Sequence, residues 1–255
     1  MPRIDPAPDP TAAHYLQRLE ALRSDADQAK IQRYFKAREG ERAETDTFIG
    51  VPMGQVFALS EACKAMPLDE IECLLESRIH EARAGAVKIM AKQATDKRAT
   101  DVHRRALYEL YLRRIDRIDD WDLVDLGAWD VVGRYLLDRP RDILTTLARS
   151  GDRWERRTAM LATLAFLRRG ELDDTYALAE VLIDDPEDLV QKPVGACLRE
   201  AGKQDRPRLL AFLDHHAASM PRTVLRFAIE HLDPDVRAHY LGLRDSTSRA
   251  ASTRP

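Results

Sequence analysis

Apolar residues recur along this chain in stripes with the three-to-four-residue spacing of amphipathic helices. Short polar breakers separate the stripes, and no segment alternates apolar and polar residues long enough to predict a sheet. The pattern therefore predicts an all-α protein. We expect helices over 11–37, 52–66, 68–76, 78–94, 97–117, 120–138, 141–149, 153–169, 173–184, 187–203, 206–218, 221–232 and 234–243.

Helix pairs recur roughly every 35 to 45 residues, with Pro or Asp-Asp at the joints. This period is typical of a HEAT-like helical repeat solenoid, in which stacked pairs form a right-handed superhelix with a concave inner surface. Pro193, several residues into its helix, removes a backbone donor and favours a curved arrangement over a straight bundle. We predict a single HEAT-like repeat domain over 11–244. A disordered, proline-rich leader over 1–10 precedes it, and a flexible polar tail over 245–255 follows.

The predicted helix within 118–135 combines an apolar stripe with distinctive polar side chains. The stripe contains Trp121, Val124, Ala128, Val131, Val132 and Tyr135. Asp119 or Asp120 can cap the start of this helix. Asp125 lies about 40° round the helix from Trp121, at the edge of the stripe, whereas Asp130 lies on the far side. One carboxylate is thus placed where desolvation matters, one turn from a large aromatic ring.

Composition excludes several classes of protein. With 44% apolar and 33% charged residues, the chain has an ordinary soluble mixture, and no apolar run is long enough to span a membrane. The start of the chain lacks the apolar core of a signal peptide, so we expect a cytoplasmic location. Cys63, Cys73 and Cys197 form no close pair, and the His residues do not cluster, so neither disulfides nor a zinc site is indicated. We expect three reduced cysteines packed as small apolar residues.

The net charge of −3 does not by itself indicate a nucleic-acid-binding protein. Basic residues nevertheless recur near the ends of the predicted helices, where an array of helices can line them along one face that follows phosphates. The alternative is that these cations lie on solvated helix faces with acidic partners four residues away, such as Glu109 with Arg113. The charge pattern alone favours this alternative.

Four segments resemble one known family in order and spacing. They are Trp121-Asp122-Leu123-Val124-Asp125, Trp154-Glu155-Arg156-Arg157-Thr158-Ala159, Gln191-Lys192-Pro193-Val194-Gly195 and Leu198-Arg199-Glu200. Upstream, Phe48-Ile49-Gly50-Val51 and His80-Glu81-x-Arg83 extend the likeness. Together they resemble the bacterial DNA alkylation repair family, the AlkD-type DNA glycosylases, over roughly residues 30 to 240, a whole domain's worth. The resemblance implies a helical repeat fold with a concave DNA-binding face.

The resemblance also implies a chemistry that suits these residues. Alkylation at N3 or N7 makes a purine cationic and a good leaving group, so the limiting species is a sugar resembling an oxocarbenium ion. A carboxylate near C1′ stabilises that charge and orients the attacking water, which predicts Asp125 as the catalytic residue. The indole of Trp121 can face the cationic nucleotide, an interaction worth about 0.5–2 kcal/mol. Arg157 is expected to hold a phosphate next to the lesion.

Further positions match the family's DNA-facing residues. By resemblance, Tyr34 supplies an aromatic ring near the lesion, and Arg199 faces the DNA backbone. From the pattern of basic residues, Lys192 is also expected to contact phosphates. The family motif has a Trp after its Gly, but this chain has Ala196, so one aromatic wall is missing. Either the grip on small cationic lesions is weaker, or there is room for a bulky adduct. Trp129 is the first candidate to fill that space; otherwise Trp129, like Trp154, is interpreted as core packing.

We therefore expect a monomeric, monofunctional DNA glycosylase that acts on alkylated purines in duplex DNA, associates with the nucleoid when bound, and needs no metal, cofactor or membrane. Bulky N3-adenine adducts are possible substrates. The resemblance implies that the base stays stacked while the enzyme approaches from the sugar side, unlike base-flipping enzymes. The alternative is a catalytically weak or inactive HEAT-like module that binds damaged or branched DNA, or a protein-binding scaffold.

Overall fold

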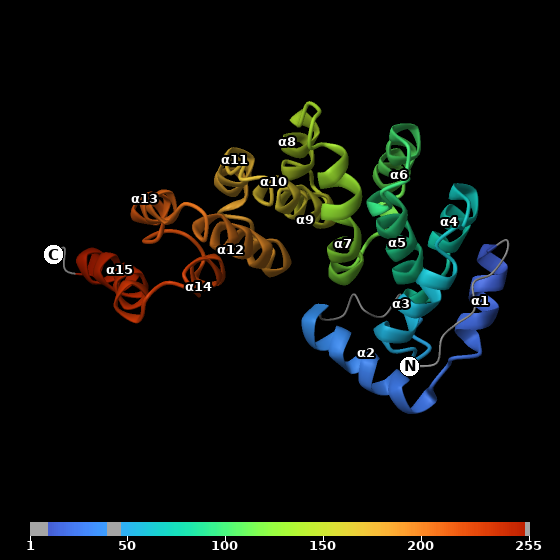
Figure 1. Cartoon of the computed structure of the whole chain (residues 1–255). Coiled ribbons are helices and arrows are strands. Elements are labelled where there is room, and N and C mark those ends of the chain that lie inside the picture. The colour runs from blue at the N-terminus through green and yellow to red at the C-terminus, as the bar shows by residue number, and fades with distance from the viewer. Residues whose placement is uncertain (1–9, 40–46, 253–255) are drawn as a thin grey trace. The chain divides into compact units, whose positions relative to one another are not determined.

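The computed structural model describes residues 10–39 and 47–252, and the side chains of 10–35 and 47–243. In this part of the chain every regular secondary-structure element is a helix. The only β-type pairing there is an isolated parallel bridge between Thr47 and Ile79. The predicted all-α fold class is therefore confirmed (Figure 1). The predicted leader over 1–10 lies almost wholly outside the described residues.

The contacts within the chain form two compact units, Met1–Tyr135 and Leu136–Pro255. The first unit contains α1 (Ala12–Glu20), α2 (Asp25–Glu39), α3 (Met53–Ala62), α4 (Leu68–Leu75), α5 (His80–Thr95), α6 (Asp101–Arg113), the 3₁₀ helix η2 (Ile115–Arg117), α7 (Trp121–Gly127) and the π-helical segment η3 (Ala128–Gly133). The second contains α8 (Asp142–Ala148), α9 (Arg153–Ala162), α10 (Leu164–Leu167), α11 (Asp173–Leu182), α12 (Asp188–Gly202), α13 (Arg206–His216), α14 (Arg222–Ala228) and α15 (Pro234–Ser252).

Within each unit, helices that are close in sequence pack against one another in two layers. In the first unit, α3, α5 and α7 form one layer, and α1, α4 and α6 form the other. In the second, α9, α12 and α14 lie in one layer, while α8 packs on α11 in the other. This stacking of helix pairs is the arrangement of an α-helical repeat.

A close approach of α12 and α14 depends on glycine. A Cβ atom added to Gly195 would lie 2.5 Å from the carbonyl oxygen of Val224 and 2.6 Å from Cβ of Phe227. Both distances are shorter than any van der Waals contact, so only glycine permits this packing. The glycine in the Gln191–Gly195 motif therefore has a structural role.

The predicted helix over 11–37 is wrong, because it is divided into α1 and α2. The division lies where the chain meets the segment before α3: the backbone N–H of Ser24 donates to the carbonyl of Ile49. Gly50 follows with φ of 80°, and a Cβ there would lie 2.0 Å from the Ser24 carbonyl oxygen. A tertiary contact thus interrupts a stripe whose local pattern is continuous.

The predicted helix over 120–138 also differs from the structure. Its α-helical part ends at Gly127, and the chain continues through the π-helical η3. Asp120 occupies the N-cap position but makes no side-chain cap hydrogen bond, and Asp119 pairs with Arg83, so the predicted carboxylate cap is wrong. At the other end of the chain, α15 continues to Ser252, beyond the predicted end at 243.

Three smaller expectations can be compared with the described residues. Cys63 and Cys197 are buried as expected, whereas Cys73 is exposed because it lies on the face of α4 opposite its core residues. Arg113 pairs with Glu72 of α4, while Glu109 pairs with Arg105, so the expected pair within α6 is wrong. No described helix combines the length and apolar character of a membrane span.

Candidate functional site

Aromatic rings from distant segments gather around Trp121 at the start of α7. The ring of Phe35 stacks on the indole with centroids 5.8 Å apart, and the ring of Tyr34 meets it edge-on at 6.2 Å. Phe35 is buried against Phe48, at 4.8 Å, whereas Tyr34 is 47% exposed. The structure therefore places the two predicted aromatic site residues, Tyr34 and Trp121, in contact within the first unit.

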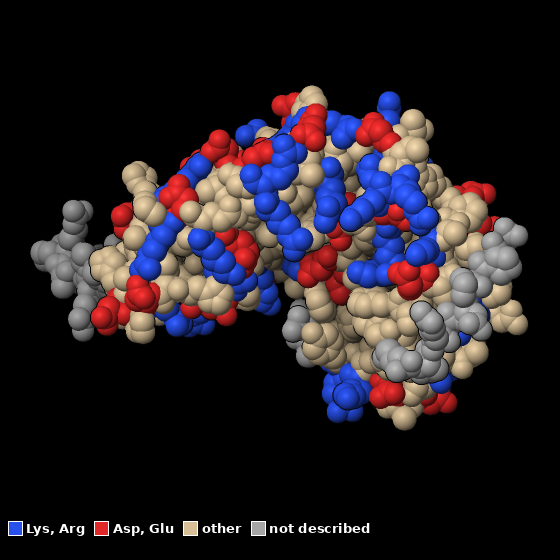
Figure 2. Space-filling model, in the orientation of Figure 1, with Lys and Arg blue, Asp and Glu red and all other residues tan. Residues whose placement is uncertain are grey.

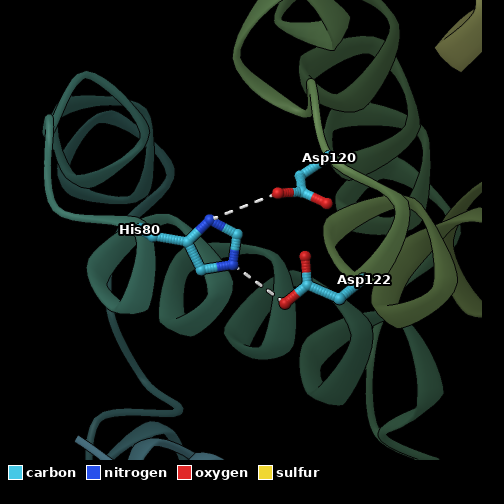
Figure 3. A group of neighbouring side chains, drawn as sticks. All are labelled: His80, Asp120 and Asp122. Atoms are coloured by element: carbon cyan, nitrogen blue, oxygen red, sulfur yellow. Dashed lines mark hydrogen bonds and ion pairs between the residues drawn. The ribbon is translucent and has the colours of Figure 1, made fainter. Parts of the chain in front are cut away.

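His80 links this cluster to the acidic residues on either side of Trp121. The imidazole is fully buried, and its Nε2 lies 2.9 Å from Oδ2 of Asp122. Its Nδ1 faces Oδ2 of Asp120 at 3.8 Å, so the ring lies between two carboxylates (Figure 3). The same ring packs on Phe35 and Phe48. Since both carboxylates flank Trp121 in sequence, His80 positions the first turn of α7.

Glu81 and Arg83 are buried charged residues of α5 that bind the segments next to the site. The carboxylate of Glu81 accepts hydrogen bonds from the backbone N–H groups of Ile49 and Gly50, at 3.1 and 2.9 Å. The pKa of Glu81 is raised above its ordinary value because burial disfavours the charged carboxylate. The amides and the neighbouring His80 act in the opposite direction, but their effect is smaller. Arg83, which is 2% exposed, donates to Asp119 at 2.9 Å. These two charged residues of α5 therefore fix the segments that precede α3 and α7.

The residue types at His80, Asp120 and Asp122 are ones that bind metal ions, and their ligand atoms lie within 4.8 Å of one another. The two ring nitrogens of His80, however, lie on different edges of the ring and face different carboxylates. One ion can take only one of these nitrogens. The arrangement is that of an imidazole hydrogen-bonded to Asp122 and facing Asp120, and we assign it a structural role.

A cavity of about 410 Å³ adjoins the aromatic cluster. Its apolar walls come from Ile31, Tyr34, Phe35, Pro52, Met53 and Trp121. Three charged residues, Asp27, Lys30 and Asp122, also line it. The cavity therefore combines flat aromatic surface with carboxylates inside the first unit.

The short helix α7 carries two carboxylates in different environments. Asp122 is largely buried, with 12% of its side chain exposed, and faces His80. Asp125 is exposed and lies one turn beyond the half-buried Trp121. Because residues four apart share a helix face, Asp125 and Trp121 lie on the same side of α7. An exposed acid thus stands beside an indole whose position is fixed by buried contacts.

The comparison with protein families agrees with this fold. The family model for the DNA alkylation repair enzyme matches residues 15–232. The chain belongs to this family. A solved structure described as a predicted DNA alkylation repair enzyme from Enterococcus faecalis is similar, with a TM-score of 0.65 and 18% sequence identity, over 83% of this chain and 97% of that one. At that identity the likeness concerns the fold alone. No curated protein matches the chain in sequence.

In this member of the DNA alkylation repair enzyme family, the remaining predicted site residues belong to the second unit. Lys192, Ala196 and Arg199 follow one another at four and three residues along α12 and share a face. Lys192 pairs with Asp188, and Arg199 pairs with Glu200 and Glu230. Ala196 is half-buried between them. Lys192 and Arg199 can therefore contact a phosphate only if they leave their carboxylate partners.

Arg157 has a different environment from the basic residues of α12. It is buried, with 6% exposed, and its Nη1 donates to the carbonyl of Leu189 in the first turn of α12. This bond ties α9 to α12, and the predicted phosphate contact remains a prediction. Trp154 is buried in the core as expected, whereas Trp129 is half-buried with the Arg134 guanidinium 5.7 Å from its ring centroid.

Acidic side chains accompany most of the basic residues that were predicted to line the DNA. Figure 2 shows Asp and Glu interspersed with Lys and Arg on the visible face of each unit. Pairs between residues distant in the chain include Arg156 with Asp185, Arg206 with Asp233, and Arg208 with Asp173. The interpretation of these cations as paired surface residues therefore holds for many of them.

Proposed function

We propose that this protein removes alkylated purines from duplex DNA by hydrolysing the N-glycosidic bond, with Asp125 as the catalytic carboxylate. The observation that carries the proposal is the exposed carboxylate of Asp125 one turn from Trp121, on a helix held by His80. Membership of the DNA alkylation repair enzyme family supports a role in repair. The lesion-contacting residues in this proposal are Trp121 and Tyr34.

The chemistry needs little activation of the leaving group. The electron pair of the N-glycosidic bond moves to the positively charged purine, which leaves as a neutral alkylated base. Water adds to C1′ of the sugar and loses a proton to Asp125 or to solvent, and an abasic site remains. A preorganised carboxylate that faces the developing positive charge typically contributes about 10²–10³ in rate. Water is the only co-reactant in this scheme.

In the proposed DNA contacts of the second unit, phosphate groups replace the carboxylates that now pair with the basic side chains. Lys192 and Arg199 each have a carboxylate partner, and phosphate would have to replace it. Exposed ion pairs contribute about 0–1 kcal/mol, so this exchange costs little. Bulky N3-adenine adducts remain in the proposed substrate range because Ala196 carries only a methyl group where the family pattern has an indole.

A module that binds DNA or protein without catalysis is the second candidate. The ion-paired cations favour its protein-binding form, because carboxylates beside Lys192 and Arg199 oppose phosphate binding. This module would keep the repeat fold and the buried supports of α7, since neither depends on catalysis. It would release no base from any alkylated duplex.

The test is base release from duplex DNA that carries N7-methylguanine, N3-methyladenine or a bulkier N3-adenine adduct, with free base measured by chromatography. Asp125→Asn keeps the shape and removes the charge, so release should fall by about 10²–10³-fold while DNA affinity is preserved. The matched control is Asp130→Asn, which removes an acid paired with Arg134. Release within a few-fold of the parent by Asp125→Asn would reject Asp125, and no release by the parent from any duplex would favour the binding module.

A further inference from the structure

A second cavity of the first unit lies at the end of α5 opposite to His80. Its volume is about 460 Å³, within the range of about 300–1,000 Å³ that is usual for small-molecule sites. It is lined by the connection between α3 and α4, by the last turn of α5, and by the connection to α6 with the first turn of that helix. Since an α-helix rises about 1.5 Å per residue, Gln93 in this lining lies about 20 Å along α5 from His80. The cavity is therefore remote from the candidate site at the start of α7.

Gln93 joins three segments that surround this cavity. Its Nε2 donates to the carbonyl oxygens of Lys64 and Met66, at 2.9 and 2.7 Å, so both amide hydrogens are used. The amide oxygen is left as an acceptor, and it faces Nε2 of His103 at 2.9 Å. Nε2 of His103 therefore carries a proton, and Nδ1 of the neutral ring is an acceptor. Hydrogen bonds thus hold the walls of the cavity together without a ligand.

Cations outnumber carboxylates around the cavity. Lys64, Lys92 and Arg98 line it together with one acid, Asp96. Beside it, the carboxylate of Glu61 accepts from Nζ of Lys64 at 2.9 Å and from Nζ of Lys92 at 2.5 Å. An ammonium group has three N–H donors, so a shared carboxylate leaves both lysines able to bind another acceptor. Three cations beside two carboxylates favour an anionic ligand.

The uncharged part of the lining suits a small hydroxylated body. Met66, Pro67 and Ala99 provide a limited apolar surface. Thr100 is the N-cap of α6, so the positive end of a helix dipole also lies at the cavity. The imidazole of His103 is the only aromatic ring among the described residues that line it, which leaves little surface on which a nucleobase could stack. A sugar, with hydroxyl groups for these polar side chains, fits this lining better than a base.

We propose that this cavity binds the phosphate monoester of a sugar-sized molecule. The phosphate is held by Lys64, Lys92 and Arg98, and the hydroxyl groups of the body face Asp96 and His103. This binding site is additional to the proposed base excision and does not depend on it. None of the residues proposed above to contact DNA or the lesion is among the described residues that line the cavity.

Isothermal titration calorimetry of the full chain without DNA tests the proposal, with glucose 1-phosphate as the probe. Methyl α-glucoside and inorganic phosphate are the comparisons, because each represents one part of the probe. Glucose 1-phosphate should bind at least about tenfold more tightly than either. No binding of glucose 1-phosphate at millimolar concentration would overturn the proposal. Equal affinity for inorganic phosphate would reject a ligand of sugar size.

Variants of the lining locate the binding. Lys92→Gln and Arg98→Gln each remove one cation and should weaken glucose 1-phosphate at least about fivefold. Ala65→Trp fills the cavity from an exposed position and should weaken it at least about tenfold. The matched control is Lys97→Gln, which removes an exposed cation of the same connection that is not among the described lining residues, and it should bind like the parent. Unchanged binding by Ala65→Trp would place the sugar phosphate elsewhere and reject the proposal.

Competition with duplex DNA separates this cavity from a DNA-binding surface. Saturating duplex should leave the affinity for glucose 1-phosphate unchanged, because the proposed DNA contacts and the cavity share no described residue. Displacement of the sugar phosphate by duplex would show that it occupies a DNA phosphate site, and would reject the proposal. Far-UV circular dichroism of each variant checks that the helices are intact before binding is compared.

Discussion

Nε2 of His80 lies 2.9 Å from Oδ2 of Asp122, although 42 residues separate them in the chain. His80 begins α5, and Asp122 lies in the first turn of α7. The bond therefore fixes the end of α7 that carries Trp121, and through it the direction in which Asp125 emerges. It makes the geometry of the proposed site depend on a residue that contacts no substrate.

Replacing His80 by Phe should destabilise the protein strongly. The change keeps an aromatic ring beside Phe35 and Phe48 but leaves two buried carboxylates without their imidazole. Removing one partner of a buried pair costs about 3–5 kcal/mol. Urea unfolding measures the loss, and His14→Phe at an exposed position of α1 is the control, with an expected change below about 0.5 kcal/mol. Equal effects of the two changes would show that the link contributes no stability.

Glu81 predicts a definite dependence of stability on pH. Burial raises its pKa in the folded protein above the ordinary value of 4.5, so the folded state binds the proton more tightly than the unfolded state does. The contribution of Glu81 is thus fully present below its ordinary pKa and is lost as pH rises through the raised value. The free energy of unfolding of the parent minus that of Glu81→Gln should therefore fall as the pH rises from the ordinary pKa of Glu81 through its raised value. A difference that rises with pH would mean that the backbone amides outweigh burial.

The basic face of α12 predicts the dependence of DNA binding on salt. Affinity for duplex should fall steeply with salt, and Lys192→Ala or Arg199→Ala should each flatten the slope of log K against log salt by about one unit or less. Fluorescence anisotropy at several salt concentrations measures the slope. Lys64→Ala, which removes an exposed cation of the first unit paired with Glu61, is the comparison and should leave the slope unchanged. A salt-independent affinity would favour a protein-binding scaffold.

Arg157 should behave differently from Arg199. Because its guanidinium is buried and donates to the carbonyl of Leu189, Arg157→Ala should lower the free energy of unfolding by about 2–4 kcal/mol. Arg199→Ala, at a more exposed position, should lower it by less than about 1 kcal/mol. Urea unfolding separates the two. Arg157→Ala with parent-like stability and reduced DNA affinity would show that the phosphate contact predicted from the sequence is its main role.

Ala196 predicts a shift of substrate preference. Ala196→Trp restores the aromatic residue of the family pattern. The variant should therefore release small methylated bases faster, relative to a large N3-adenine adduct, than the parent does. The ratio of the two base-release rates measures this, with Ala218→Trp at an exposed position of the same unit as the control. Equal ratios for the parent and Ala196→Trp would contradict a role for this position in lesion choice.

The local pattern of the sequence was sufficient for the all-α class and for the shared helix face of Trp121 and Asp125, although not for every helix boundary. Apolar spacing predicts a buried stripe wherever one face of a helix must leave water, and two residues four apart share that face in any α-helix. The burial of Trp154 follows from the same reasoning. The motif that contains His80 was also recognisable, but its spacing carries no information about its partner. Three acids within four residues around Trp121 were the only local signal that a buried hydrogen-bonding partner was needed.

Tertiary structure decided what depends on residues that are distant in the chain. The contact between Ser24 and Ile49 divides a stripe that locally reads as one helix. Asp120 occupies a cap position, yet its carboxylate faces His80 because that ring is buried beside it. Arg157 has the sequence environment of a surface cation but lies against α12. In each case a hydrogen bond or ion pair formed out of water outweighs a weak local preference, since an unpaired buried polar group costs more than a helix cap or a solvated side chain contributes.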